Sequence, residues 1–244
     1  PRSTPLYSSA ASDVYKRQYG GSALPAQCRR VEVYLNDNET RARGPNLMDF
    51  DQGVHAGMIT RFNPFQPYAE HVRNIIDIER ISGIPERLHV VADAMYGSGR
   101  NYLKSLLGGT GLEVVEIRGE MNPGFGGVHP EPIMKYLGAT TSAIANGHGD
   151  VGLITDGDGD RIGVVTNTGK IIWPDRLLML FARDVVSRNP GADVLYDVKC
   201  SRRLANVVTE AGGRPIMWKS GHSLMKAKMK ETGALLAGEL SGHI

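Results

Sequence analysis

Three aspartates alternate with two glycines over residues 156–160, and Arg161 follows them directly. Glycine permits tight backbone curvature, so the three carboxylates can converge on one point. Converging carboxylates repel one another unless a cation lies between them, and oxygen ligands suit Mg²⁺ or a similar divalent ion. A cation beside a metal also suits a phosphate group that both contact. The spacing therefore predicts a metal site formed by Asp156, Asp158 and Asp160.

Other loops contain similar acidic patterns. A calcium-binding EF-hand loop would need Gly at position 161 and Glu at position 167, but the chain has Arg161 and Asn167. A haloacid-dehalogenase-type phosphotransferase also places Asp-x-Asp after a strand, usually with Thr two residues on, where this chain has Asp160. A solvated acidic turn is the remaining alternative. The preceding apolar run, the interleaved glycines and the adjacent arginine favour the metal site.

Three other positions carry groups that could bind a ligand. Glu239 and Ser241 lie on a glycine-flanked turn and could bond adjacent hydroxyls of a sugar, although an ordinary turn is an alternative. Lys219 and His222 flank a predicted helix start, where backbone N–H groups can bind an anion, although a plain helix cap would look the same. Lys199 is a lone basic residue after a predicted strand, and a surface lysine is its alternative.

The elements around these positions alternate between two hydrophobic periods. Strands are predicted at 88–93, 112–117, 151–155, 162–166, 193–198, 214–218 and 234–237, and helices at 98–107, 133–146, 174–188, 201–212 and 222–232. This alternation predicts an α/β fold of two consecutive mixed, mainly parallel sheet units with flanking helices. The candidate groups all follow strands, and parallel strands end along one edge. Together they predict a cleft for a phosphorylated sugar.

Breaks in the pattern divide the chain further. Residues 1–18 resemble a translated sequencing adaptor and are expected to be a non-native tail. Residues 19–85 contain one strand candidate, 31–35, and a predicted helix, 67–81. Turn-forming residues near 83–85 and 168–169 predict boundaries there, and hence domains at 86–168 and 169–244.

The composition excludes several classes of protein. The 244 residues are 41% hydrophobic and carry a net charge of +2, which is ordinary for a globular protein and far from the basic footprint of a nucleic-acid binder. No apolar run approaches the ~18 residues of a membrane span. Two cysteines give no disulfide framework, so a reducing cytoplasm is the expected compartment, with no nucleic-acid or membrane partner.

The longer motifs resemble the α-D-phosphohexomutase superfamily, in particular its bacterial phosphomannomutase/phosphoglucomutase branch. The resemblance is carried by TDGDGDRIGVVTNTG, DVKCSRRL and WKSGHSLMKAKMKETGALLAGELSGHI. It is dense over residues 151–244. It is looser over residues 86–150, where VVADAMYGSGR and the segment 125–132 still fit the second of the family's four domains.

The resemblance implies an enzyme that interconverts hexose 1- and 6-phosphates through a bisphosphate intermediate. Its Mg²⁺ would be held by the aspartate triad, and Arg161 would help position the family's phosphoserine. Glu239 and Ser241 would contact sugar hydroxyls. The positions that the resemblance places in the active-site cleft are Lys199, His222 and His243, and Lys219 is expected to bind substrate.

One part of the family pattern is missing. The nucleophile belongs to a T-x-S-H-N-P-type loop, and here Asn63-Pro64 follows Arg-Phe instead of Ser-His. The chain is therefore expected to be a fragment that lacks most of the first domain and all of the fourth. Residues 19–85 would be a remnant of the first domain and its connecting helix. A phosphoglucosamine mutase and a non-catalytic metal- and sugar-phosphate-binding fragment are the alternatives.

Overall fold

The structure, a computed structural model, describes residues 25–44, 47–84 and 87–244, and the predicted adaptor tail lies outside these residues. The described residues divide into two compact units, and the division along the chain falls between Asp77 and Ile78. The smaller unit holds three helices: α2 (Pro25–Thr40), α3 (Phe50–His55) and α4 (Phe65–Ile75). The larger unit begins with α5 (Ile78–Ser82) and contains both sheets.

Two predictions for the smaller unit are corrected. The strand predicted at 31–35 is wrong, because these residues lie within helix α2. Tyr34 and Leu35 lie three and four residues after Val31, so the same apolar residues also fit a helical period. The helix predicted at 67–81 is two helices, because Ile76 has an extended backbone that ends α4.

The first sheet is mixed, with the strand order β2-β1-β3-β4-β5. Strand β1 runs parallel to β2 and β3, whereas β4 is antiparallel to both of its neighbours. The strands are β1 (His89–Asp93), β2 (Glu113–Ile117), β3 (Val151–Thr155), β4 (Ile162–Thr166) and β5 (Ile171–Ile172). The sheet therefore extends past residue 168, where the sequence predicts a boundary.

Helices α6 (Tyr102–Leu107) and α7 (Gly138–Ala145) are shorter than predicted. Residues with positive φ precede α6, and a separate 3₁₀ turn at Met134–Tyr136 precedes α7. Helix α7 packs its Ile144 against one face of the sheet, where Val91, Ile154 and Val165 are fully buried. This core supports the loop between β3 and β4, which carries the aspartates.

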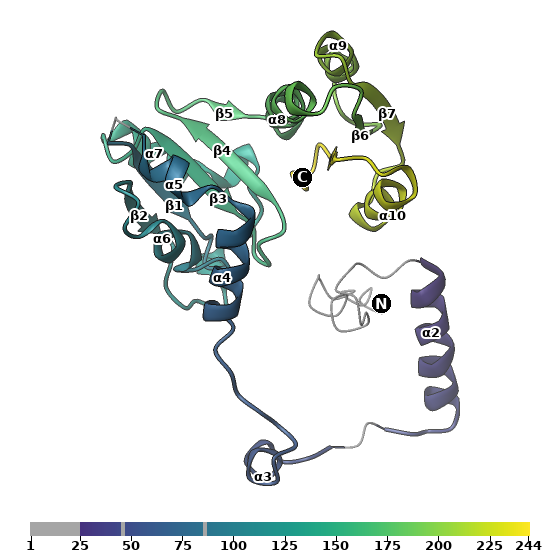
Figure 1. Cartoon of the computed structure of the whole chain (residues 1–244). Coiled ribbons are helices and arrows are strands. Elements are labelled where there is room, and N and C mark those ends of the chain that lie inside the picture. The colour runs from purple at the N-terminus through teal and green to yellow at the C-terminus, as the bar shows by residue number, and fades with distance from the viewer. Residues whose placement is uncertain (1–24, 45–46, 85–86) are drawn as a thin grey trace. The chain divides into compact units, whose positions relative to one another are not determined.

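The second sheet has the order β7-β6-β8 and is entirely parallel (Figure 1). Its elements are β6 (Asp193–Asp197), β7 (Arg214–Trp218), β8 (Leu236–Gly238), α8 (Pro174–Arg188), α9 (Arg203–Glu210) and α10 (His222–Thr232). Val194 and Val208 pack with α8 on one face, and Leu195 packs against Met225 of α10 on the other. Both sheet units together confirm the predicted α/β fold.

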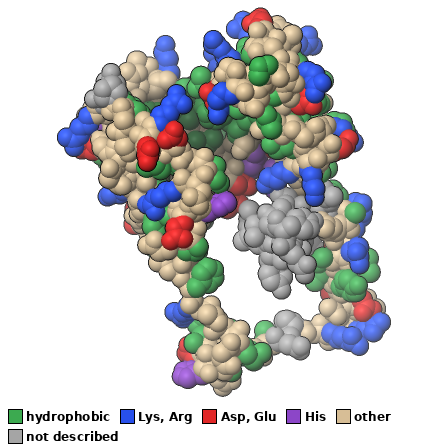
Figure 2. Space-filling model, viewed as in Figure 1, with side chains coloured by type: hydrophobic (Ala, Val, Ile, Leu, Met, Phe, Trp, Pro, Cys, Tyr) green, Lys and Arg blue, Asp and Glu red, His purple; other side chains and the backbone are tan. Residues whose placement is uncertain are grey.

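The surface gives two general observations. On the face in Figure 2, the described Lys and Arg side chains are dispersed among others and form no continuous basic area. Among the described residues, no helix has the length and apolar character that crossing a membrane requires.

Candidate metal and sugar-phosphate site

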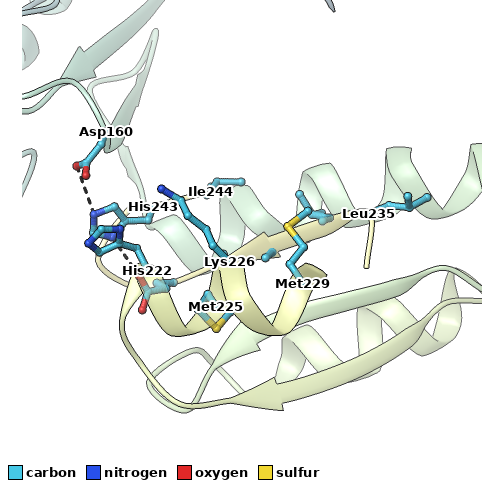
Figure 3. Close-up of a pocket in the computed structure, with 12 residues that line it drawn as sticks. Asp160, His222, Met225, Lys226, Met229, Leu235, His243 and Ile244 are labelled. Carbon is cyan, nitrogen blue, oxygen red and sulfur yellow. Dashed lines mark ion pairs between the residues drawn. The ribbon is translucent and has the colours of Figure 1, made fainter. Parts of the chain in front are cut away.

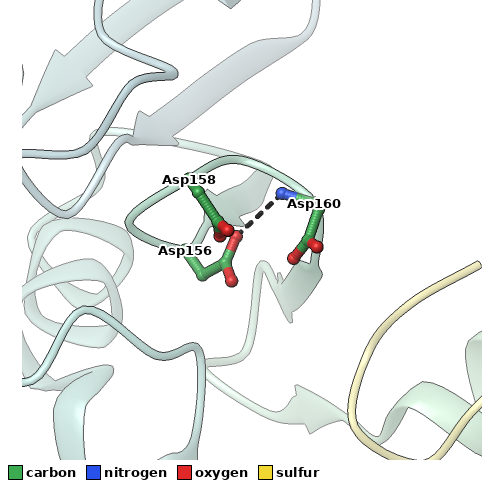
Figure 4. A group of neighbouring side chains, drawn as sticks. All are labelled: Asp156, Asp158 and Asp160. Atoms are coloured by element: carbon green, nitrogen blue, oxygen red, sulfur yellow. Dashed lines mark hydrogen bonds between the residues drawn. The ribbon is translucent and has the colours of Figure 1, made fainter. Parts of the chain in front are cut away.

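The three aspartates occupy the turn of the β3–β4 hairpin. Their side chains offer oxygens that all lie within 4.8 Å of one another (Figure 4). Asp156 Oδ1 accepts hydrogen bonds from the backbone N–H of Asp160 at 2.9 Å and of Arg161 at 3.1 Å. These bonds curl the loop around Asp156, and Gly159 adopts the positive φ of 79° that the tight turn requires.

The loop that follows β1 packs against this turn. The Ser98 N–H donates to the Gly157 carbonyl at 2.9 Å. Gly97 lies against the same turn so closely that a Cβ atom there would be 2.7 Å from the carbonyl oxygens of Asp156 and Gly157. Since real Cβ atoms do not approach backbone oxygens so closely, Gly97 lets the two loops meet. No pattern in the sequence indicates this role of Gly97.

The electrostatics of the triad fit a divalent cation. Asp156 is only 4% exposed. Its pKa is raised to about 7, because burial disfavours the charged carboxylate and because Asp158 and Asp160 add repulsion. A divalent cation among the three oxygens would remove this repulsion and favour the ionised form. The donor set of carboxylate oxygens matches the preference of Mg²⁺, so the residues present fit that ion.

Arg161 is held beside the triad. Its Nη1 donates to Glu131 Oε1 at 2.5 Å, and its Nε lies 3.5 Å from Asp156 Oδ2. Nε is buried and has no hydrogen-bond partner. Arg161 is thus held between Glu131 and Asp156, and its contact to a phosphate stays a prediction. Glu131 comes from the segment 125–132, and no local sequence pattern indicates its pairing with Arg161.

His243 joins two loops that are named here for their predicted ligands. Residues 156–161 form the metal loop, and residues 239–243 form the sugar loop. Its Nε2 lies 3.3 Å from Asp160 Oδ1, and its Nδ1 lies 2.9 Å from Ser241 Oγ and 3.1 Å from Glu239 Oε2. The backbone is tied at the same place, because the N–H of Ile162 donates to the carbonyl of Gly242 at 3.2 Å. The two loops therefore form one continuous group of side chains.

The charges in this group stabilise each other. The hydrogen bond from His243 is the main cause that lowers the pKa of Asp160 to about 2. Burial alone would lower the pKa of His243, but hydrogen bonds to Asp160 and Glu239 outweigh it and raise that pKa to about 9. Burial alone would raise the pKa of Glu239, but bonds from His243 and Gly221 lower it. A charged imidazole thus lies between two carboxylates.

Glu239 is less accessible than the sequence analysis expects. It is 4% exposed, and its Oε1 accepts the Gly221 N–H at 2.5 Å. This bond ties the loop after β8 to the start of α10. Ser241, by contrast, is exposed.

A pocket of about 310 Å³ opens beside these residues (Figure 3). Its polar side is formed by Asp160, Glu239, His222 and His243, and the two histidine rings stack with centroids 5.0 Å apart. Lys226 lines the pocket one helical turn after His222. The apolar side is formed by Met225, Met229 and Leu235.

The two remaining predicted lysines lie at the carboxyl edge of the second sheet. Lys199 follows β6 and Lys219 follows β7, and both are exposed. Lys199 lies near Asp197, since its charge helps lower the pKa of that carboxylate. No bond joins either lysine to the histidine group in the described residues, so the structure leaves them at the margin of the site.

Family models match most of this architecture. Residues 66–169 match "Phosphoglucomutase/phosphomannomutase, alpha/beta/alpha domain II", and residues 173–244 match domain III of the same family. The first match covers strands β1 to β4 of the five-stranded sheet and the loop with the three aspartates. The second covers the three-stranded sheet with the sugar loop.

Individual proteins agree with the family models. The chain is 46% identical over 211 residues to a phosphomannomutase/phosphoglucomutase of Pseudomonas aeruginosa, covering 86% of this chain and 44% of that protein. It is 43% identical over 189 residues to a phosphoglucomutase of Neisseria gonorrhoeae, covering 77% of this chain and 40% of that protein. A solved phosphoglucomutase/phosphomannomutase family protein from Burkholderia thailandensis has a TM-score of 0.65 and 44% identity, with coverage of 75% and 39%.

The chain thus spans about two fifths of the length of the curated relatives that it matches. Within that span, the matched domains include the aspartate triad, Arg161 and residues 239–243 of the candidate site. The chain belongs to the phosphoglucomutase/phosphomannomutase family, of which it carries domains II and III.

Proposed function

We propose that this chain forms the metal and sugar-phosphate half of an enzyme that interconverts hexose 1- and 6-phosphates in the cytoplasm. The observation that carries this proposal is the contact between His243 and Asp160. It supports the proposal because it joins the aspartate triad to the loop that we assign to sugar hydroxyls. The names of the relatives support the reaction class.

Each candidate residue has a role in this proposal. Asp156, Asp158 and Asp160 hold Mg²⁺, which supplies a Lewis acid and positive charge beside a phosphoryl group when it is bound. Arg161, whose guanidinium is held by Glu131 and Asp156, supplies positive charge for phosphate oxygens beside the metal.

The remaining residues recognise the sugar and its phosphate. Ser241 is exposed and offers a hydroxyl to the sugar, and Glu239 keeps that loop in place through Gly221 and His243. Lys199 and Lys219 add positive charge around the anionic ligand, and His222 lines the pocket beside His243.

A second candidate function has its own support. No T-x-S-H-N-P-type loop occurs in the 244 residues, and positioning groups alone do not replace a nucleophile. The 244-residue chain by itself would then bind metal and sugar phosphate without catalysing transfer. The choice among glucose, mannose and glucosamine phosphates is open in both proposals.

Calorimetric titration of the chain with glucose 1,6-bisphosphate in the presence of Mg²⁺ tests the shared part of both proposals. We expect saturable binding of the bisphosphate, weaker binding of glucose 1-phosphate and no binding of unphosphorylated glucose, because the site is built for phosphate. Failure of the bisphosphate to bind, or equal heats with glucose, would contradict the proposal.

A further inference from the structure

Asp197 is a buried carboxylate to which the sequence analysis gave no role. It is the last residue of β6, the central strand of the second sheet, and it is 1% exposed. An ionised carboxylate at such a position is costly unless its oxygens are bonded. Its hydrogen-bond donors therefore identify the segments of the chain that Asp197 holds in place.

Those partners come from three different loops. Oδ1 accepts from Cys200 Sγ at 3.0 Å and from the Leu240 N–H at 3.2 Å, and Oδ2 accepts from Ser220 Oγ at 2.7 Å. Cys200 follows β6, Ser220 follows β7 and Leu240 follows β8. One carboxylate thus bonds to the loop after every strand of this sheet.

The bonds favour the ionised form of Asp197. Burial alone would raise the pKa of its carboxyl, but the hydrogen bonds from Ser220, Cys200 and Leu240 outweigh burial and lower it. Burial and the neighbouring Asp197 together raise the pKa of the Cys200 thiol, which stays protonated and able to donate. The three hydrogen-bond donors around Asp197 are thus consistent with an ionised carboxylate.

Candidate ligand-binding residues lie immediately beside each bonded residue. Lys199 precedes Cys200, Lys219 precedes Ser220, and Glu239 and Ser241 flank Leu240. Glu239 also bonds to Gly221, which links two of the same loops a second time.

We propose that Asp197 is a positioning residue that fixes the three loops of the second sheet in the arrangement that binds a phosphorylated sugar. The assignment of a ligand rests on the function proposed above. The fixing of the loops does not, since it follows from the contacts of Asp197 alone.

The test compares Asp197→Asn with Asp193→Asn in the 244-residue chain. Asp193 begins the same strand, and its carboxylate pairs with Arg214 at 2.7 Å, so this control removes a carboxylate from the opposite end of β6. Val208→Ala, a core change in α9, serves as a control for lost stability. Ser220→Ala removes one donor and keeps the carboxylate, in case Asp197→Asn fails to fold.

Hydrogen exchange of backbone amides is the first measurement. We expect Asp197→Asn to speed exchange at Leu240 by about tenfold or more, because the acceptor of this bond loses its negative charge and only one oxygen remains for three donors. The amides of 219–221 should exchange faster too. The reference is the exchange rate of the slowest core amides, which reports global unfolding. Asp193→Asn and Val208→Ala should leave the ratio of the loop exchange rates to this reference rate unchanged. Ser220→Ala should speed exchange at 219–221 only. Unchanged rates at Leu240 and 219–221 in Asp197→Asn would overturn the proposal.

Titration with glucose 1,6-bisphosphate is the second measurement. We expect Asp197→Asn to raise the Kd by about tenfold or more, while Mg²⁺ affinity stays at the wild-type value and Val208→Ala keeps wild-type sugar-phosphate affinity. If wild type does not bind the bisphosphate, the proposed function fails, and the exchange data still decide the role of Asp197. If Asp197→Asn loosens the loops but binds the ligand as wild type does, its positioning role is refuted.

Discussion

The Nε2 atom of His243 lies 3.3 Å from Oδ1 of Asp160, so a residue in the segment after β8 contacts a predicted metal ligand in the turn between β3 and β4. The loops that carry these residues are also tied by the backbone bond between Ile162 and Gly242. Residues 80 or more positions apart along the chain thus meet at one place. The candidate site exists only where these two loops meet.

The first prediction concerns the metal ligands. Asp158→Asn removes one of the three carboxylate charges, so we expect the affinity for Mg²⁺ to fall by about tenfold or more. Asp184→Asn is the matched control, since Asp184 is exposed on α8 and pairs with Arg188. Calorimetry at constant pH measures both variants. Equal affinities of wild type and Asp158→Asn would remove Asp158 from the metal site.

The second prediction concerns the support beneath the metal loop. In Gly97→Ala the new Cβ would lie 2.7 Å from two backbone oxygens, so the loop must shift. We expect weaker Mg²⁺ binding with the folded state retained at 25 °C. Gly138→Ala is the control, because a Cβ there meets nothing within 4 Å and the residue begins helix α7. Wild-type Mg²⁺ affinity in Gly97→Ala would show that the contact does not shape the site.

The third prediction separates two roles of Glu239. Glu239→Ala leaves the Gly221 N–H without its acceptor, and we expect a loss of about 1–3 kcal/mol in the free energy of unfolding. Glu239→Gln keeps an acceptor oxygen and should lose less stability. Both variants should bind glucose 1,6-bisphosphate more weakly if the carboxylate charge matters for the sugar loop. Urea denaturation and calorimetry measure the two effects, and equal stability of all three proteins would contradict the structural role.

The fourth prediction concerns acid stability. The pKa of Asp197 is lowered in the folded state, so its contribution is fully present above the unfolded value of about 3.9 and is lost as the pH falls through the folded value. The stability difference between wild type and Asp197→Asn should therefore be constant from pH 7 to 5 and shrink below about pH 4. Urea denaturation at several pH values measures it. A difference that stays constant to pH 3 would refute the linkage.

The fifth prediction concerns catalysis. The chain contains no T-x-S-H-N-P-type loop, so the 244-residue protein should show no mutase activity. A coupled assay with glucose 1-phosphate and glucose 1,6-bisphosphate measures it, in protein purified from a host that lacks its own mutase. Turnover above background would mean that another residue supplies the nucleophile.

Much of this arrangement was predictable from local patterns. The aspartate triad, Arg161 and the sugar loop follow strands with clear apolar runs, and glycine spacing marks their turns. The parallel strands of the second sheet then bring Lys199, Lys219 and Glu239 to one edge, as the pattern requires.

Other parts depended on contacts that no local pattern contains. Asp197 looks like any aspartate at a strand end, and only the folded chain shows three loops bonded to it. The pairing of Glu131 with Arg161 joins residues 30 positions apart. The apolar pattern of residues 31–35 fits both a strand and a helix, so this pattern alone does not predict the helix that is observed.

The most direct test of the site is a map of backbone amide shifts in the 244-residue protein by NMR. Mg²⁺ should first be added alone, and glucose 1,6-bisphosphate should follow. We expect Mg²⁺ to shift the amides of 156–161, and the bisphosphate to shift those of 239–243 together with Arg161 and His222. Ligand shifts confined to the second sheet, with no response at Arg161, would contradict a single site formed by the metal loop and the sugar loop.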